Sequence, residues 1–215
     1  QAGEIDINTS TDYLTGIIKS QGWDITSKNS QNIADLMVGT ATKGSFDVAE
    51  LGQSMSYVGG IAKTLGVGLD EQFTMLAMMA DRNLKGSRAG TNTAEMLQRM
   101  YMPSSKENAK ILSKYGIQSR DESGLKDIGT LIGEFSKMSK ADRLQYFGKR
   151  GGRAFSALES GGVEEFSSKR EDILKSGGKA KFLSDKFMET LEGKWGKLIS
   201  TISKFSISIM DKLTP

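Results

Sequence analysis

The sequence predicts an all-α protein, and three observations carry this prediction. Apolar residues recur at spacings of three and four along most of the chain, which is the period of one helix face. Glycine occurs 25 times and proline twice among 215 residues, a combination typical of many short helices separated by glycine. No segment alternates apolar and polar residues for long enough to predict a sheet. We expect a bundle of roughly nine or ten short helices that ends in one long C-terminal heptad helix.

The chain is expected to have three parts. Residues 1–29 would form an N-terminal helix and linker, residues 30–178 a compact helical core, and residues 179–215 a long amphipathic or coiled-coil helix. Because the sequence begins at Gln1 without a methionine, we expect a fragment of a longer parent chain, to which the last helix would lead.

Residues that favour helix ends punctuate the sequence. Capping side chains precede the predicted helices at Ser10 or Thr11, Ser30, Asp47, Asp70, Ser87, Ser104 and Ser139. Asp47 with Glu50, and Ser104 with Glu107, have the spacing of a reciprocal capping box. Glycines suited to a left-handed final position follow the predicted helices at Gly22, Gly66, Gly86, Gly116, Gly148, Gly161 and Gly177.

Apolar stripes between these ends predict the core. The first two stripes are Val48, Leu51, Met55, Val58, Ala62 and Leu65, and then Phe73, Leu76, Ala77, Ala80 and Leu84. Later stripes are Met96, Leu97 and Met100, then Ile111, Leu112 and Tyr115, then Ile128, Leu131, Ile132, Phe135 and Met138. We assign two methionine clusters to helical cores, Met75, Met78 and Met79 and then Met96, Met100 and Met102. Residues 116–124 read as a loop with a short hairpin near Ile117.

The C-terminal segment carries a heptad seam. Its apolar residues, at spacings of 4, 3, 4, 3 and 4, are Leu191, Trp195, Leu198, Ile202, Phe205 and Ile209. The seam could pack on its own domain or associate with copies of the chain, as a trimer or hexamer, or with a partner. Lysines that flank this face, Lys194, Lys197, Lys204 and Lys212, leave membrane-surface binding as a third alternative.

The composition excludes most catalytic chemistry. The chain has no His and no Cys, so it lacks the Ser-His-Asp triad, the thiolate nucleophile and the usual zinc ligands. Adjacent acids at Asp70/Glu71, Asp121/Glu122, Glu164/Glu165 and Glu171/Asp172 are better explained as helix starts or solvated faces. We predict no enzyme, no cofactor and no metal site. The longest uncharged stretch, Leu51–Ala62, is too short to span a membrane.

Basic residues concentrate in the second half of the chain. Residues 1–107 have a net charge of −3 and residues 108–215 a net charge of +6. One cluster contains Lys137, Lys140, Arg143, Lys149, Arg150 and Arg153, interleaved with Tyr146, Phe147 and Phe155. We favour a structural interpretation, basic helix ends around core aromatics. The alternative is that Lys149, Arg150 and Arg153 contact DNA or an acidic surface.

A series of linked motifs resembles the core region of phage tail tape measure proteins. It includes "V-x-E-L" at Val48–Leu51, "Y-V-G" and "A-K-x-L-G-V" within Tyr57–Val67, and "L-K-G-S-x-A-G-T" at Leu84–Thr91. Downstream, "FGKRGGRAFSAL" at Phe147–Leu158 and "TLEGKWGKLIST" at Thr190–Thr201 follow in the family's order. The resemblance covers about residues 30–215. Asn83 stands where the family often has Gly, and Gly60 where it often has Pro.

The resemblance implies a structural virion protein without catalytic residues in this region. Such a protein lies in the lumen of the tail tube near the tip, sets tail length during assembly in the host cytoplasm, and leaves before the DNA during ejection. Its implied partners are copies of itself, tail tube proteins, and tail tip or baseplate proteins, with transient contact to the host envelope. A membrane-active module that inserts amphipathic helices into the envelope is the alternative.

Overall fold

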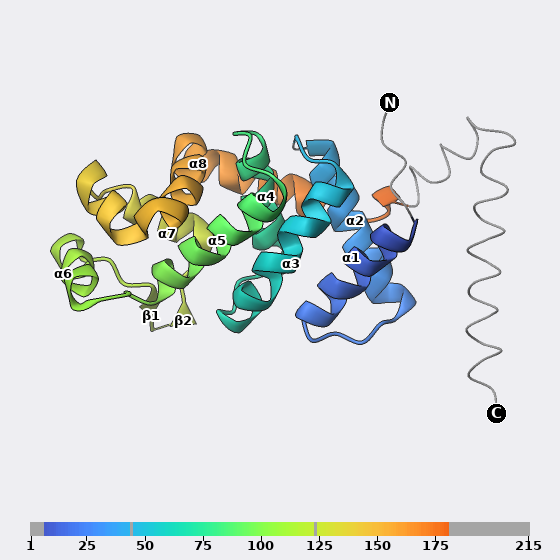
Figure 1. Ribbon diagram of the computed structural model, residues 1–215, viewed down its shortest axis with the longest axis horizontal. Coiled ribbons are helices and arrows are strands. Elements are labelled where there is room, and N and C mark those ends of the chain that lie inside the picture. The colour runs from blue at the N-terminus through green and yellow to red at the C-terminus, as the bar shows by residue number, and fades with distance from the viewer. Residues whose placement is uncertain (1–6, 44, 123, 181–215) are drawn as a thin grey trace, which may run out of the picture. The chain divides into compact units, whose positions relative to one another are not determined.

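The described part of the chain is almost entirely helical, as the sequence predicts. The computed structural model describes residues 7–43, 45–122 and 124–180. In chain order the elements are α1 (Ile7–Ser20), α2 (Ser27–Lys43), α3 (Val48–Thr64), α4 (Leu69–Ala80), α5 (Gly86–Tyr101), α6 (Lys106–Tyr115), β1 (Arg120–Asp121), β2 (Gly124–Leu125), α7 (Ile128–Phe135) and α8 (Lys140–Leu174). The chain divides into two units, Gln1–Gly177 and Gly178–Pro215. All these elements belong to the first unit, in which α1 and α2 lie at one end and α6 and α7 at the other (Figure 1).

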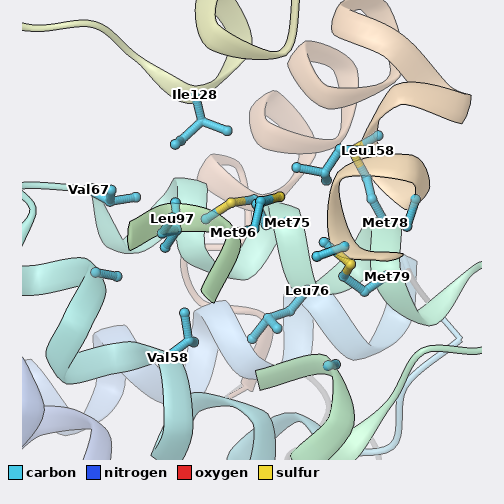
Figure 2. Packing of buried hydrophobic residues seen from close by; sticks show 14 of the residues in the cluster. Val58, Val67, Met75, Leu76, Met78, Met79, Met96, Leu97, Ile128 and Leu158 are labelled. Atoms are coloured by element: carbon cyan, nitrogen blue, oxygen red, sulfur yellow. The ribbon is translucent and has the colours of Figure 1, made fainter. Parts of the chain in front are cut away.

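Helix α4 is the centre of the core. It packs against α2, α3, α5 and α8, and every residue from 71 to 80 is buried. Figure 2 shows Met75, Met78 and Met79 of α4 among apolar side chains of α3, α5, α7 and α8. Unbranched methionine side chains fill the irregular gaps between helices that cross at different angles. The two methionine clusters are core residues as predicted, except that Met102 lies just beyond α5 and is 57% exposed.

The start of α4 is fixed by a buried carboxylate. Glu71 Oε2 accepts a hydrogen bond from the Gly68 N–H at 3.2 Å, and its Oε1 accepts one from the Ile128 N–H at 2.9 Å. The side chain therefore serves the first turns of both α4 and α7, where backbone N–H groups lack helical partners. Burial raises the pKa of Glu71, against the effect of these hydrogen bonds and of Arg170.

Helix α8 is three helical segments joined at two glycines. Gly148 (φ 63°, ψ −167°) and Gly162 (φ 69°, ψ −172°) have backbone angles that residues other than glycine rarely adopt. In a straight helix, residues 147 and 155 would be about 12 Å apart along the axis. The Phe147 and Phe155 rings instead stack with centroids 4.6 Å apart, so segment 149–161 folds back on segment 140–147.

The turn at Gly148 is stabilised by residues of other helices. The Tyr146 carbonyl cannot accept its normal helical hydrogen bond there, because the helix ends two residues later. Arg99 Nη1 donates to this carbonyl at 2.9 Å and Asn108 Nδ2 at 3.2 Å. The Tyr146 hydroxyl in turn donates to the Arg99 carbonyl at 2.5 Å. This reciprocal pairing attaches α8 to the end of α5.

Several predicted helix ends are correct and others are displaced. Asp47 and Ser139 cap α3 and α8, and Asp47 forms the predicted capping box with Glu50. The other predicted starts lie within a few residues of the observed ones, as for α6, which is capped by Ser105 rather than Ser104. Gly22, Gly66, Gly116 and Gly148 have positive φ as predicted.

Three predicted glycine stops are wrong. Gly161 and Gly177 are each one residue early, since Gly162 and Gly178 have the positive φ. Gly86 has the predicted positive φ (57°) but begins α5 rather than ending a helix, and Asn83 (φ 57°) adopts the left-handed conformation after α4. Asparagine tolerates this conformation better than most residues, so a turn that often uses glycine can form at Asn83. The hairpin pairs Arg120 with Leu125, later than predicted.

Candidate basic groove

The basic cluster of the sequence separates into a buried and an exposed part. In segment 149–161 of α8, Ala154, Phe155 and Leu158 are buried, whereas Lys149, Arg150 and Arg153 are exposed. The rings of Tyr146, Phe147 and Phe155 pack against Phe135, at centroid distances of 5.1 to 6.1 Å. These aromatics are therefore core residues, as the structural interpretation predicts.

One face of segment 149–161 forms the first wall of a groove. Lys149 and Arg153 are four residues apart, so their side chains leave the helix on the same side. Both line the groove, whereas Arg150 is exposed but does not line it. Leu144, from the preceding helical segment, extends this wall with a 65% exposed apolar side chain.

The second wall comes from the connection between α4 and α5. The left-handed Asn83 turns the chain there, and α5 then starts with Arg88 in its first turn. That turn contains no acidic residue. Arg88 is exposed and lines the groove from α5, whereas Lys149 and Arg153 line it from α8.

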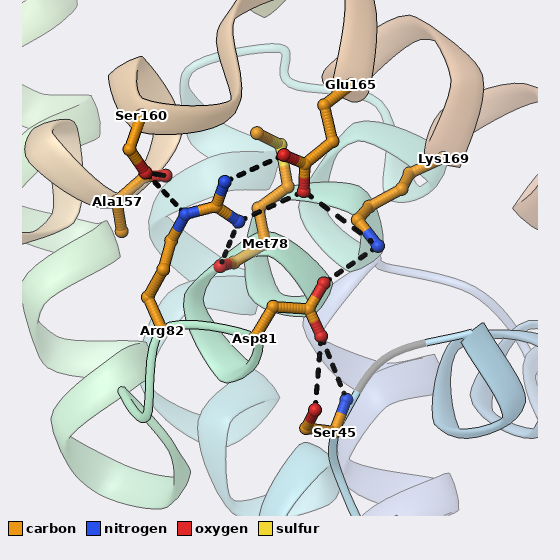
Figure 3. Close-up of polar contacts among 8 residues, drawn as sticks. All are labelled: Ser45, Met78, Asp81, Arg82, Ala157, Ser160, Glu165 and Lys169. Atoms are coloured by element: carbon orange, nitrogen blue, oxygen red, sulfur yellow. Dashed lines mark hydrogen bonds and ion pairs between the residues drawn. The ribbon is translucent and has the colours of Figure 1, made fainter.

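An ion-pair network fixes the two walls to each other (Figure 3). Arg82, just beyond α4, donates to both carboxylate oxygens of Glu165 in α8, at 3.0 and 2.7 Å. It also donates to the Met78 carbonyl at 3.2 Å and to the Ser160 hydroxyl. The hydrogen bonds from Arg82 lower the pKa of Glu165 below its ordinary value. Arg82 lines the groove, but its charge is matched by that of Glu165.

A second branch of the network reaches the start of α3. Lys169 Nζ lies 2.8 Å from Asp81 Oδ2 and 3.9 Å from Glu165 Oε1. Asp81 accepts hydrogen bonds from the Ser45 backbone N–H at 3.1 Å and from its hydroxyl at 3.3 Å. These contacts join the chain before α3, the end of α4 and the last segment of α8.

The groove has a volume of about 560 Å³ and a cationic lining. It is lined by Arg82, Asn83, Leu84, Arg88, Leu144, Lys149, Gly152, Arg153, Ser156, Ala157 and Ser160. No carboxylate is among these residues. Within the described ranges, Arg88, Lys149 and Arg153 make no hydrogen bond and no ion pair. We call this feature the basic groove.

Sequence reasoning found only one wall of the basic groove. Lys149 and Arg153 stood out as part of a local cluster, but Arg88 is about sixty residues away in the acidic half of the chain. No local pattern connects Arg88 to them. The predicted interface residues of the seam lie outside the described residues, namely Leu191, Trp195, Leu198, Ile202, Phe205 and Ile209.

The described residues contain no candidate metal site and no candidate membrane span. No group of three or more acidic side chains that could hold a metal ion occurs among residues 7–43, 45–122 and 124–180. Over the same ranges, no helix combines the length and apolar character needed to cross a bilayer.

Comparison with known proteins decides the family. Residues 1–151 match the family described as phage-related minor tail protein. The chain belongs to this family. As a family member it is similar to the tape measure protein of Pneumococcus phage Dp-1, with 22% identity over 219 residues. That alignment covers 98% of this chain and 19% of the relative.

A second relative supports the same assignment. The chain is 27% identical over 114 residues to the probable tape measure protein of Escherichia phage P2, covering 53% of this chain and 14% of the relative. No solved structure matches the chain significantly. The resemblance found in the sequence is confirmed, and the names of the family and relatives describe structural tail proteins. The chain spans less than a fifth of the length of either relative.

Proposed function

We propose that this chain is a compact structural segment of a longer tape measure protein that lies in the tail tube lumen near the tip. The alignment along nearly the whole chain with a much longer tape measure protein carries this proposal. The helices of residues 7–174 fold around a hydrophobic core, so the segment is a packed unit rather than one extended helix. The remaining parent chain would set tail length, and the whole protein would leave the tube before the DNA.

Protease accessibility in virions tests this location. A protease recognition sequence inserted between α1 and α2, where Ile25 is 58% exposed, would be cut readily in the free protein. In intact virions the lumen should protect it, and triggered ejection should make it cleavable. A virion with the same sequence on an outer tail protein is the control. Cleavage in intact virions at the rate of that control would overturn the lumen location.

Separate substitutions test the division of labour within the parent chain. An in-frame deletion outside this segment should shorten tails in proportion to the residues removed, as measured by electron microscopy. Phe73→Asp, which places a charge in the core, should reduce the number of assembled tails without changing their length. Shorter tails from Phe73→Asp would contradict the proposal.

Self-association through the heptad seam is part of the proposal. We expect the 215-residue chain to form a trimer or hexamer, whose mass light scattering would give. Leu198→Lys with Ile202→Lys should produce monomers, because lysines at seam positions are buried in the assembly. A monomeric wild-type chain at micromolar concentration would remove the seam as a self-association surface.

The membrane-active alternative rests on the lysines that flank the seam. Under this alternative, the chain floats with anionic vesicles at low salt and is released at high salt. Absence of flotation at low salt would exclude it. Flotation with an intact oligomer would instead point to successive roles in assembly and ejection.

A further inference from the structure

We propose that the basic groove binds the phosphate backbone of duplex DNA without reading its base sequence. The proposal concerns Arg88, Lys149 and Arg153, which converge on one groove from two helices. It does not depend on the location of the chain in the tail. Its failure would leave the proposed function untouched.

The arrangement of charges points to an anionic ligand. Several long basic side chains elsewhere in the described fold are paired with carboxylates, as in Arg99 with Glu95 and Arg170 with Asp70. The three groove cations are instead unpaired within the described ranges, and no carboxylate lines the groove beside them. Like charges four residues apart on a helix repel each other. The entry of an anion with several charges would relieve this repulsion.

The groove contains hydrogen-bond donors and positive charges that can bind the oxygens of a phosphate backbone. Arginine guanidinium groups bind phosphate oxygens with two parallel hydrogen bonds, and lysine adds a compact charge. The Ser156 hydroxyl lines the same wall and can donate to a phosphate oxygen. Because Arg88 lines the groove from α5 and Lys149 and Arg153 line it from α8, a phosphate backbone in the groove would be contacted by both helices.

The surroundings favour duplex DNA over single-stranded nucleic acid and over an acidic peptide. Single strands are held by bases that stack on exposed aromatic rings, but the nearby Tyr146, Phe147 and Phe155 are buried. An acidic peptide bound by strand addition would need backbone partners at a free strand edge. The groove walls are helices joined by a turn, and their lining offers charged and polar side chains instead.

Fluorescence anisotropy with a labelled duplex of random sequence tests the proposal. The full 215-residue chain should bind the duplex in about 50 mM salt, and the affinity should fall steeply as salt rises. The triple variant R88Q/K149Q/R153Q should bind at least about tenfold more weakly. Its salt dependence, the slope of log K against log salt, should fall by about 3, because each lost phosphate contact removes about one unit.

Two further variants separate groove binding from net charge. K63Q/K106Q/K110Q removes three exposed, unpaired lysines outside the groove and should bind like the wild type. R88K/R153K keeps the charge and should retain most of the affinity. Circular dichroism should give the same helicity for all variants, since every substituted side chain is exposed.

Defined outcomes would overturn the proposal. Equal loss of affinity in the two triple variants would mean that overall charge, not the groove, binds DNA. Polyglutamate that competes as well as DNA through the three groove residues would make the groove an acidic-protein site. Binding to phosphatidylglycerol vesicles through these residues, without DNA binding, would assign it to a membrane surface.

Discussion

Helices α4 and α8 show two ways in which this sequence fixes the path of a helix. Helix α4 has 12 residues, no glycine, and neighbours on all sides. Helix α8 has 35 residues, two backbone breaks at glycine, and a largely exposed outer face. The position of α4 is set by burial of its side chains, whereas the path of α8 is set by backbone conformations that only glycine adopts easily. Substitutions should therefore act through different mechanisms in the two helices.

The largest effect is expected in α4. Phe73→Ala should lower the free energy of unfolding by about 3–5 kcal/mol, because the fully buried ring leaves a cavity that the packed neighbours cannot fill. Denaturant titration followed by circular dichroism measures the change. Ile25→Ala, at a 58% exposed position, is the control and should stay within about 0.5 kcal/mol of the wild type. A loss below about 1 kcal/mol for Phe73→Ala would contradict the central position of α4.

The next effect is expected at the second turn of α8. Gly162→Ala should destabilise the fold by about 1–3 kcal/mol through backbone strain alone, because nothing lies within 4 Å of the added methyl group. The matched control is Gly60→Ala, at an exposed and equally uncrowded position in the C-terminal half of α3. That substitution should stabilise the fold by about 0.5–1 kcal/mol. The same sign for both substitutions would show that α8 does not turn at Gly162.

A smaller effect is expected where α4 and α8 are joined by Arg82 and Glu165. A double-mutant cycle with Arg82→Gln and Glu165→Gln should give a coupling energy of about 0.5–1 kcal/mol, the upper range for partly exposed pairs. The side chains are 26% and 31% exposed. The i,i+4 pair of Lys175 and Glu171, which is 68% and 67% exposed, should couple less strongly. Equal coupling in the two cycles would mean that the network of Arg82 does not hold the helices together.

The smallest effect depends on pH and concerns the start of α8. Hydrogen bonds from Lys114, Tyr115 and Ser139 lower the pKa of Asp142 from 3.8 to about 2. Between these values the unfolded chain binds more protons than the folded one, so stability falls as the pH drops through this range. Asp142→Asn should therefore have a lower Tm than the wild type at about pH 6 and approach it near pH 2. A constant difference in Tm over this range would contradict the contribution of the charged carboxylate.

The sequence predicted the fold class and much of the core, because apolar period and glycine position are local signals. Leu51, Met55 and Val58 were correctly assigned to the buried face of α3. For α4 one apolar stripe and the methionine cluster were predicted as core, yet the polar Gln72 and Thr74 are also buried. Whether a helix is covered on one face or on all faces depends on the neighbours that fold around it. This information is not contained in the period of a single segment.

The basic groove was predictable only in part for a similar reason. Lys149 and Arg153 are neighbours on one helix, so their spacing alone places them together. Arg88 lines the same groove because α5 packs against α8. The charge of Arg82 is not available to a ligand, because Arg82 forms an ion pair with Glu165 of a later segment. Pairing between distant segments decides which cations remain available. A count of basic residues along the chain cannot make that distinction.

In α8 the number of residues does not determine the distance between the two ends of the helix. A continuous helix of 35 residues would extend about 52 Å, but the reversal at Gly148 makes segment 149–161 retrace part of the path already covered. Residues added to such a turn lengthen the polypeptide without moving its ends apart, whereas residues added to a straight helix do both. In a protein whose residue number sets a length, only the straight helical portions would therefore add length in proportion to their residues. A folded unit such as this one would not.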